Sequence, residues 1–120
     1  MQTILAVDDS ASMRSLVNFV LDEAGFDVVM AEDGQEALEV AQSKEFDLVL
    51  TDINMPRMDG IELIKELRQL PTYKFIPLLV LTTESGTEKK MEGKAAGATG
   101  WIVKPFQPNQ LVSVIERVLC

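Results

Sequence analysis

Short apolar runs alternate with segments of helical periodicity along the whole chain. The short apolar runs predict buried strands over residues 3–7, 27–31, 47–51, 77–81 and 101–103. Apolar residues that recur with the period of a helix predict helices over residues 13–24, 33–43, 61–67, 88–96 and 111–119. Each predicted strand is therefore followed by a predicted helix.

Strands that are nearly all apolar are typical of a parallel sheet with helices on both faces. Right-handed crossovers restrict the order of such a sheet. Because the first and third predicted strands are both followed by carboxylates, we expect them to be neighbours, and the order 2-1-3-4-5 satisfies this. We therefore predict an α/β fold, a doubly wound, flavodoxin-like (βα)5 sandwich. The length of 120 residues suits a single domain over residues 1–120, with no effector domain.

Local signals mark some of the predicted helix ends. Gly25 follows the last apolar residue of the first helix, where a C-terminal cap is expected. Asp33 and Glu36 have the spacing of a capping box at the start of the second helix. The helix over 88–96 contains Gly93 and few large apolar residues. We expect it to be little buried and more mobile than the others.

The composition narrows the possible functions. The chain has no histidine, which excludes histidine-based triads, imidazole metal sites and a phosphohistidine within the chain itself. The net charge of −8 argues against nonspecific nucleic-acid binding. Since no apolar run approaches the roughly 18 residues of a membrane helix and no signal peptide is present, we expect a cytoplasmic protein without membrane insertion. The single cysteine, Cys120, is interpreted as an incidental free thiol.

The charge is unevenly distributed along the chain. Residues 85–120 contain five basic and three acidic residues, so the excess of acidic residues lies in the rest of the chain. Lys89, Lys90 and Lys94 either form an ordinary solvated helix face or mark the place where an acidic partner docks. The sequence leaves both interpretations open.

Polar side chains follow four of the predicted strands at the point where each strand ends. They are Asp8 and Asp9, then Asp52, then Thr82 and Thr83, and finally Lys104. Because the carboxyl ends of parallel strands lie along one edge of a sheet, we expect these side chains to converge. Taken singly, each has an ordinary explanation: a helix N-cap for either aspartate, a turn for the threonines and a solvated surface position for the lysine. The combination is far more specific than any one member.

Three carboxylates held close together repel one another, so they would either take up protons or recruit a cation. Oxygen ligands without histidine or thiolate favour Mg²⁺, with Mn²⁺ as a substitute. A carboxylate beside such a cation can attack phosphorus and become an aspartyl phosphate, with Lys104 stabilising the transferring group. Thr82 would then donate a hydrogen bond to a phosphoryl oxygen. Trp101, on the neighbouring strand, either fills the space that Thr82 vacates or is an ordinary half-buried edge aromatic.

Three segments resemble the receiver domain of bacterial two-component response regulators. They are Val7-Asp8-Asp9-Ser10, Asp52-Ile53-Asn54-Met55-Pro56-Arg57-Met58-Asp59-Gly60 and Val103-Lys104-Pro105-Phe106. The resemblance covers the whole chain, whose length is similar to that of stand-alone, CheY-like receivers. It implies that Asp52 is the phosphoacceptor. It also implies Mg²⁺ ligands at Asp9, Asp52 and the Asn54 backbone carbonyl, with Asp8 assisting through water.

The same resemblance implies roles for residues around the phosphoacceptor. Lys104 corresponds to the invariant lysine of the family. The other roles are hydrolysis tuning at Asn54 and Glu84, a switch hydroxyl at Thr82, an aromatic switch position at Trp101, and a cis peptide bond between Lys104 and Pro105.

The resemblance implies a signalling switch that catalyses only its own phosphorylation and dephosphorylation, and not an enzyme with a separate substrate. A histidine kinase would be the phosphodonor, and a phosphatase is a possible further partner. The face formed by the helix over 88–96, the strand over 101–103 and the final helix would change its affinity for a protein such as a flagellar motor switch protein. Chemotaxis is the expected pathway. The alternative is a phosphorelay or kinase-regulating receiver outside chemotaxis.

Two hypotheses from other classes fit the sequence less well. A Mg²⁺-dependent aspartyl phosphohydrolase would carry an acid two residues after its first-strand nucleophile, whereas Asp8 is followed there by Ser10. An interaction module that works without phosphorylation would usually lack one of the site residues, and this chain has them all.

Overall fold

The computed structural model describes residues 2–119; Met1 and Cys120 lie outside the described range, and with them the interpretation of the thiol. The strands are β1 (Thr3–Val7), β2 (Asp27–Ala31), β3 (Leu48–Thr51), β4 (Leu78–Thr82) and β5 (Gly100–Val103). The helices are α1 (Ala11–Glu23), α2 (Gly34–Ser43), α3 (Gly60–Arg68), α4 (Thr87–Ala96) and α5 (Pro108–Leu119), with a short 3-10 helix, η1 (Pro71–Tyr73), before β4. All of the predicted strands and helices are present. Within the described range, no helix is long and apolar enough to cross a membrane.

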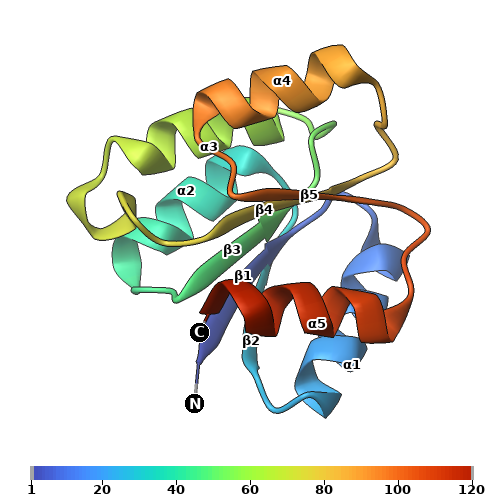
Figure 1. The fold of residues 1–120 in the computed structure, drawn as a ribbon. Coiled ribbons are helices and arrows are strands. Elements are labelled where there is room, and N and C mark those ends of the chain that lie inside the picture. Colours follow the sequence, from blue (N-terminus) through green and yellow to red (C-terminus); the bar gives the residue numbers. More distant parts are fainter. Residues whose placement is uncertain (1, 120) are drawn as a thin grey trace.

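The strands form one parallel sheet in the order β2-β1-β3-β4-β5, which confirms the predicted doubly wound (βα)5 fold. Helices α1 and α5 cover one face of the sheet, and α2, α3 and α4 cover the other (Figure 1). In the register between β1 and β3, Val7 lies opposite Thr51. The residues that follow these strands, Asp8 and Asp52, therefore start from adjacent positions at one edge of the sheet.

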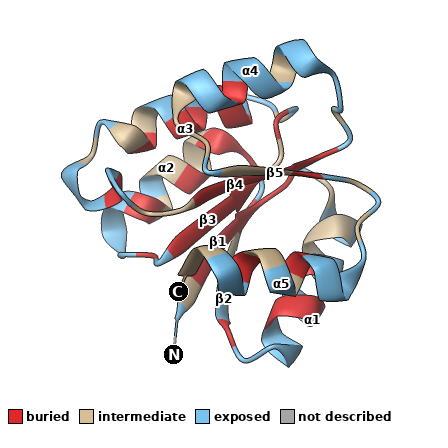
Figure 2. Ribbon diagram, viewed as in Figure 1, coloured by how far each residue is buried: buried red, intermediate tan, exposed pale blue. Residues whose placement is uncertain are grey.

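Alternate strand residues enter two separate apolar cores. Leu5 and Val7 belong to the core under α2, α3 and α4, whereas Ile4 and Ala6 belong to the core under α1 and α5. Burial is continuous along the central strands and on the inner sides of most helices, while α4 is largely exposed (Figure 2). This double burial explains why the strands are almost entirely apolar.

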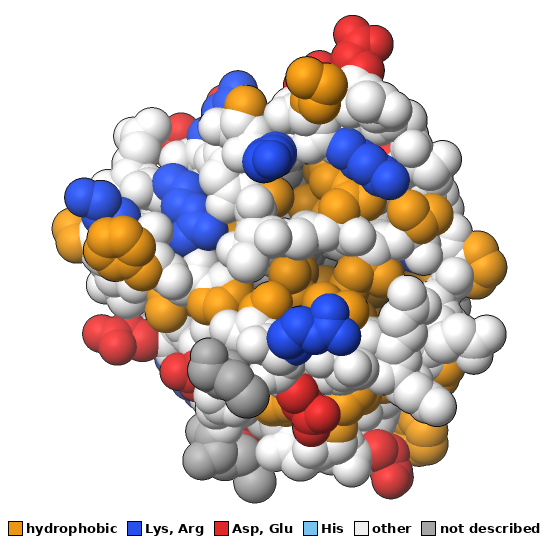
Figure 3. Space-filling model, in the orientation of Figure 1, with side chains coloured by type: hydrophobic (Ala, Val, Ile, Leu, Met, Phe, Trp, Pro, Cys, Tyr) orange, Lys and Arg blue, Asp and Glu red, His pale blue; other side chains and the backbone are white. Residues whose placement is uncertain are grey.

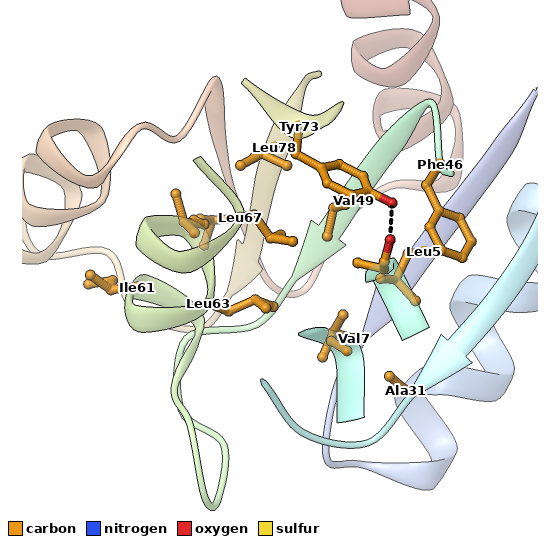
Figure 4. Packing of buried hydrophobic residues seen from close by; sticks show 14 of the residues in the cluster. Leu5, Val7, Ala31, Phe46, Val49, Ile61, Leu63, Leu67, Tyr73 and Leu78 are labelled. Atoms are coloured by element: carbon orange, nitrogen blue, oxygen red, sulfur yellow. Dashed lines mark hydrogen bonds between the residues drawn. The ribbon is translucent and has the colours of Figure 1, made fainter. Parts of the chain in front are cut away.

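Tyr73 fixes the end of α2 to the core beneath it. The side chain is buried in this core (Figure 4). Its hydroxyl is shared between the carbonyl oxygens of Ala41, at 2.7 Å, and Lys44, at 2.8 Å. Burial raises the pKa of the Tyr73 hydroxyl, so it remains a hydrogen-bond donor at neutral pH. These two bonds give the buried hydroxyl hydrogen-bond partners inside an otherwise apolar cluster.

The predicted helix ends are present, one of them in altered form. Gly25 follows α1 in the left-handed region, with a φ of 93°, as expected for a C-terminal cap. Asp33 caps α2, and its Oδ1 accepts a hydrogen bond from the Glu36 N–H at 2.8 Å. The Glu36 carboxylate, however, accepts from the N–H of Glu32 and not from that of Asp33. The return bond of the capping box is therefore shifted by one residue.

Helix α4 is attached much more firmly at its C-terminal end than at its start. Of its residues only Gly93 is buried, and the N-cap, Gly86, provides no side-chain hydrogen bond. At the other end the Arg68 guanidinium donates two hydrogen bonds to the carbonyl of Gly97, at 3.0 and 2.7 Å. Arg68 also donates to the carbonyls of Tyr73 and Ile76. The predicted low burial of α4 is confirmed, and its greater mobility stays a prediction.

Candidate functional site

Three carboxylates meet at the carboxyl ends of β1 and β3. Asp8 and Asp9 directly follow β1, and Asp52 directly follows β3. One oxygen from each carboxylate lies within 4.8 Å of the others. Backbone hydrogen bonds hold the two chain segments, because the Asp52 N–H donates to the Val7 carbonyl and the Asp8 N–H donates to that of Ala31. The structure therefore brings together the acidic residues that were predicted to converge.

Lys104 directly follows β5, the edge strand beyond β4, and its side chain reaches this cluster from there. Its ammonium donates to Oδ2 of Asp8 at 2.7 Å and to Oδ2 of Asp52 at 3.0 Å. All three side chains are largely buried, with exposed fractions of 9%, 8% and 12%. Burial by itself would lower the pKa of Lys104, but the hydrogen bonds that its ammonium donates to Asp8 and Asp52 outweigh burial and raise that pKa. Lys104 is therefore a firmly protonated cation between two carboxylates, and the peptide bond to Pro105 is cis, as expected.

Local hydrogen bonds fix the orientation of the buried Asp8 and the largely buried Asp52. Oδ1 of Asp8 accepts from the Ser10 N–H at 2.9 Å, and Oδ1 of Asp52 accepts from the Ile53 N–H at 2.6 Å. The N-cap of α1 is Ser10, so the alternative that Asp8 or Asp9 caps this helix is wrong. Asp9 is exposed. The two buried carboxylates thus turn their Oδ2 atoms toward Lys104, while the third faces solvent.

Thr82, Glu84 and Trp101 form a second part of the site. Thr82 is fully buried, and its hydroxyl accepts from the N–H of Glu84 at 3.3 Å. The Trp101 indole N–H donates to the Glu84 carbonyl at 2.9 Å. The half-buried indole lies against Gly93 of α4, where an added Cβ would come within 2.6 Å of the ring. The backbone of Glu84 therefore connects the predicted switch hydroxyl of Thr82 with the predicted aromatic position at Trp101. Thr83 is exposed.

Several contacts at the site were not predicted from the sequence. The Arg14 guanidinium donates to the carbonyl of Asp8 at 2.7 Å. Asp33 and Arg57 form a two-point ion pair between the loop after β2 and the loop after β3. Because of this pair the pKa of Asp33 is lowered and that of Arg57 is raised. Nothing in the spacing of these residues signals a contact across 24 positions.

The donor set suits a hard divalent cation. Three carboxylates and one ammonium leave a formal excess of two negative charges, and every potential side-chain ligand is an oxygen. Mg²⁺ prefers oxygen ligands and usually keeps several waters, which matches a site where one carboxylate is exposed. Asn54, the predicted carbonyl ligand, lies in the exposed part of the loop two residues after Asp52. The residues present therefore fit the predicted Mg²⁺ site.

A family model described as the response regulator receiver domain matches residues 4–116. The chain belongs to this family. The receiver resembles a solved structure of the Vibrio cholerae chemotaxis protein CheY4, at 52% identity and a TM-score of 0.95, with 98% of each chain covered.

Two curated relatives differ in their own length. The receiver is 40% identical over 116 residues to the Vibrio cholerae chemotaxis protein CheY-3, which covers 96% of this chain and 89% of that protein. It is 37% identical over 116 residues to the Bacillus subtilis alkaline phosphatase synthesis transcriptional regulatory protein PhoP. That match covers 97% of this chain, which spans only 48% of PhoP. The similarity thus includes chemotaxis proteins and a transcriptional regulator.

Proposed function

We propose that this receiver is a phosphorylation-activated switch of a two-component system, in which Asp52 accepts a phosphoryl group from a histidine kinase. The observation that supports this most strongly is the Lys104 ammonium shared between Asp8 and Asp52. It provides a fixed positive charge beside a buried carboxylate, where the oxygens of a transferring phosphoryl group need stabilisation. Because these 120 residues contain no histidine, the phosphohistidine of the proposed reaction lies outside them.

In the proposed step, Oδ2 of Asp52 attacks the phosphorus of the phosphohistidine. A P–O bond forms, the P–N bond breaks, and the imidazole leaves with the electron pair and is protonated by solvent. Oδ1 is held by the Ile53 N–H at 2.6 Å and Oδ2 by Lys104 at 3.0 Å, and Oδ2 attacks as the ammonium shifts from it to an oxygen of the incoming phosphoryl group. The receiver catalyses only this transfer and the later hydrolysis of its own aspartyl phosphate, whose rate Asn54 and Glu84 tune.

Mg²⁺ is the proposed cofactor, with Mn²⁺ as a substitute. Asp9, Asp52 and the backbone carbonyl of Asn54 would hold the ion, and Asp8 would assist through water. When bound, the ion would neutralise negative charge on the transferring group. The fit of the all-oxygen donor cluster supports this assignment.

The hydrogen-bond chain from Thr82 to Trp101 supports the proposed switch. An aspartyl phosphate carries about −1.5 to −2 charge at neutral pH, and it would attract the Thr82 hydroxyl as a donor. Any displacement of Thr82 alters its bond with the N–H of Glu84, and the carbonyl of Glu84 holds the indole of Trp101. The proposed signal thus reaches α4, which contacts the indole through Gly93.

The proposed output surface is the face made by α4, β5 and α5. Figure 3 views this face and shows basic side chains around a strip of apolar atoms. A groove of about 340 Å³ is lined by Lys90, Lys94 and Trp101, among others. These features support an acidic partner with an apolar anchor, such as a flagellar motor switch protein in a cytoplasmic chemotaxis pathway. A phosphorelay or kinase-regulating role remains the alternative, and the similarity to PhoP extends beyond chemotaxis.

The phosphorylation chemistry is tested by intact mass after incubation with acetyl phosphate, with and without Mg²⁺. We expect a Mg²⁺-dependent gain of one phosphoryl group in the wild type and none in Asp52→Asn. Asp59→Asn is a matched control, because Asp59 is the exposed N-cap of α3 and asparagine caps equally well. An equal gain in Asp52→Asn would contradict the assignment of Asp52. Steady turnover of a phosphomonoester would instead indicate a phosphohydrolase.

The pathway is tested by binding to a purified flagellar motor switch protein before and after phosphorylation. Tighter binding of the phosphorylated form would support the chemotaxis assignment. Unchanged binding would contradict that assignment, with the mass experiment still reporting on the switch chemistry.

A further inference from the structure

Arg57 has an unusual backbone conformation in the loop that joins β3 to α3. Its φ is 67°, and among residues 2–119 it alone has a positive φ without being a glycine. Side chains with a Cβ rarely adopt this region unless the surroundings require it. Something other than local preference therefore holds residue 57 in place.

The side chain of Arg57 supplies that constraint. Its Nε donates to Oδ2 of Asp33 and its Nη2 donates to Oδ1, both at 3.0 Å. Asp33 is buried and also caps α2. A two-point guanidinium–carboxylate pair fixes orientation as well as distance. The centre of the loop is thus attached to the fixed N-terminus of a neighbouring helix.

The backbone beside Arg57 is seated on the same helix. The Gly34 N–H donates to the Met58 carbonyl at 3.1 Å, and a Cβ on Gly34 would lie 2.3 Å from that oxygen. The loop closes on itself where the Gly60 N–H donates to the Ile53 carbonyl at 2.8 Å. Asn54 lies between the attachment at Ile53 and the one at Met58.

We propose that the Asp33–Arg57 pair is a positioning device that sets the affinity of the site for its divalent cation. Neither residue is a proposed ligand of the ion. Arg57 acts by holding the loop so that the backbone carbonyl of Asn54 lies where the carboxylates of Asp9 and Asp52 can share a cation with it. This inference rests on the cation site of the proposed function, and it adds a control on cation binding that lies outside the ligands. Partners that orient metal ligands typically change metal affinity by about 10- to 100-fold when removed.

Charge alone predicts the opposite effect. Arg57 is a cation three residues from a proposed ligand, so its removal should make the site more negative and strengthen Mg²⁺ binding. Loss of positioning should instead weaken binding. The direction of the change therefore separates the two explanations.

The test is the Mg²⁺ dissociation constant, measured by isothermal titration calorimetry on the full chain. We expect about tenfold weaker binding in Arg57→Gly, and a smaller loss in Arg57→Lys, which keeps the charge and one contact. Glycine is favoured at positive φ, so Arg57→Gly should not lose binding by unfolding; its urea midpoint is measured in parallel. Lys65→Ala, which removes an exposed cation from α3, is the matched control and should bind Mg²⁺ at least as tightly as the wild type.

Unchanged or tighter binding in Arg57→Gly, with Mg²⁺ bound normally by the wild type, overturns the positioning proposal alone. An absence of Mg²⁺ binding in the wild type overturns both this proposal and the cation site of the proposed function. Asp9→Asn locates the ion that the wild type binds, because it should weaken binding only if the ion is held at the carboxylates; unchanged binding in Asp9→Asn also overturns both proposals.

Discussion

The loop after β3 (residues 52–59) and the loop after β4 (residues 83–86) border the same site but are held very differently. The first is fixed by an ion pair, by one backbone bond to α2 and by its own closure at Gly60. The second is held near the site by the bond from Glu84 to Thr82 and by the bond from Trp101 to Glu84. Asp52, the proposed phosphoacceptor, thus begins the fixed loop, whereas Thr82 precedes the loosely held one.

Under the proposed function, this difference would suit the two loops to separate tasks. A group that must meet a phosphoryl donor in a set geometry gains from a rigid surrounding. A group that must report the new charge needs a segment with another accessible position. Because Glu84 has few strong contacts, we expect the loop after β4 to have a second accessible position.

The largest expected effect comes from adding one methyl group at the glycine where each loop meets the following helix. Gly60→Ala would place a Cβ 2.0 Å from the Asp52 carbonyl oxygen, so the loop or α3 must move. We expect a loss of about 1–3 kcal/mol in the free energy of unfolding. Gly86→Ala, with open space around its Cβ, should change it by about 0.5 kcal/mol or less. Urea denaturation measures both, and equal losses would contradict the contrast between the loops.

A smaller effect is expected where α4 meets the indole. Gly93→Ala would place a methyl group against Trp101, so the ring must shift toward solvent. Stability should change little, because the roughly 1 kcal/mol gain in helix propensity opposes the lost packing. Trp101 is the only tryptophan, so fluorescence reports on it directly. We expect red-shifted emission and stronger acrylamide quenching.

The control for this change is the reverse substitution at an exposed position of α4. Ala95→Gly should cost about 1 kcal/mol in stability and leave the indole emission unchanged. The same emission shift in both variants would show that the fluorescence follows helix stability and not the contact with the ring.

The smallest expected effect concerns the Asp33–Arg57 pair and pH. Arg57 lowers the pKa of Asp33 below 3.8, its value in an unfolded chain. The stabilisation is therefore present above pH 3.8 and is lost as the pH falls through the lowered pKa of the folded state. Because Arg57 is exposed, the effect should be small. The difference in urea midpoint between the wild type and Arg57→Gly should be larger at neutral pH than in acid. A difference that stays constant with pH would contradict this.

The sequence was sufficient for the fold and for the buried centre of the site. Apolar periodicity predicted the strands, and the rule that parallel strands end at one edge brought Asp8, Asp52 and Lys104 together. The contacts that lock the site could not be predicted. Arg57 adopts a backbone conformation that its residue type disfavours, and its partner lies in another loop. The position of the Trp101 ring depends on the absence of a side chain at Gly93. In the sequence alone, a glycine inside a helix indicates only a weaker helix.

Because Arg68 holds its C-terminal end, we expect α4 to move by tilting about that end. The Arg68 guanidinium holds the carbonyl of Gly97 just beyond the last turn, while the first turn has no side-chain cap. A ten-residue helix is about 15 Å long, so a tilt of about 10° around that end would move its first turn by about 2.6 Å. A sub-ångström change at the indole near the middle of α4 would thus be magnified at its outer end, where Thr87 and Glu88 face solvent.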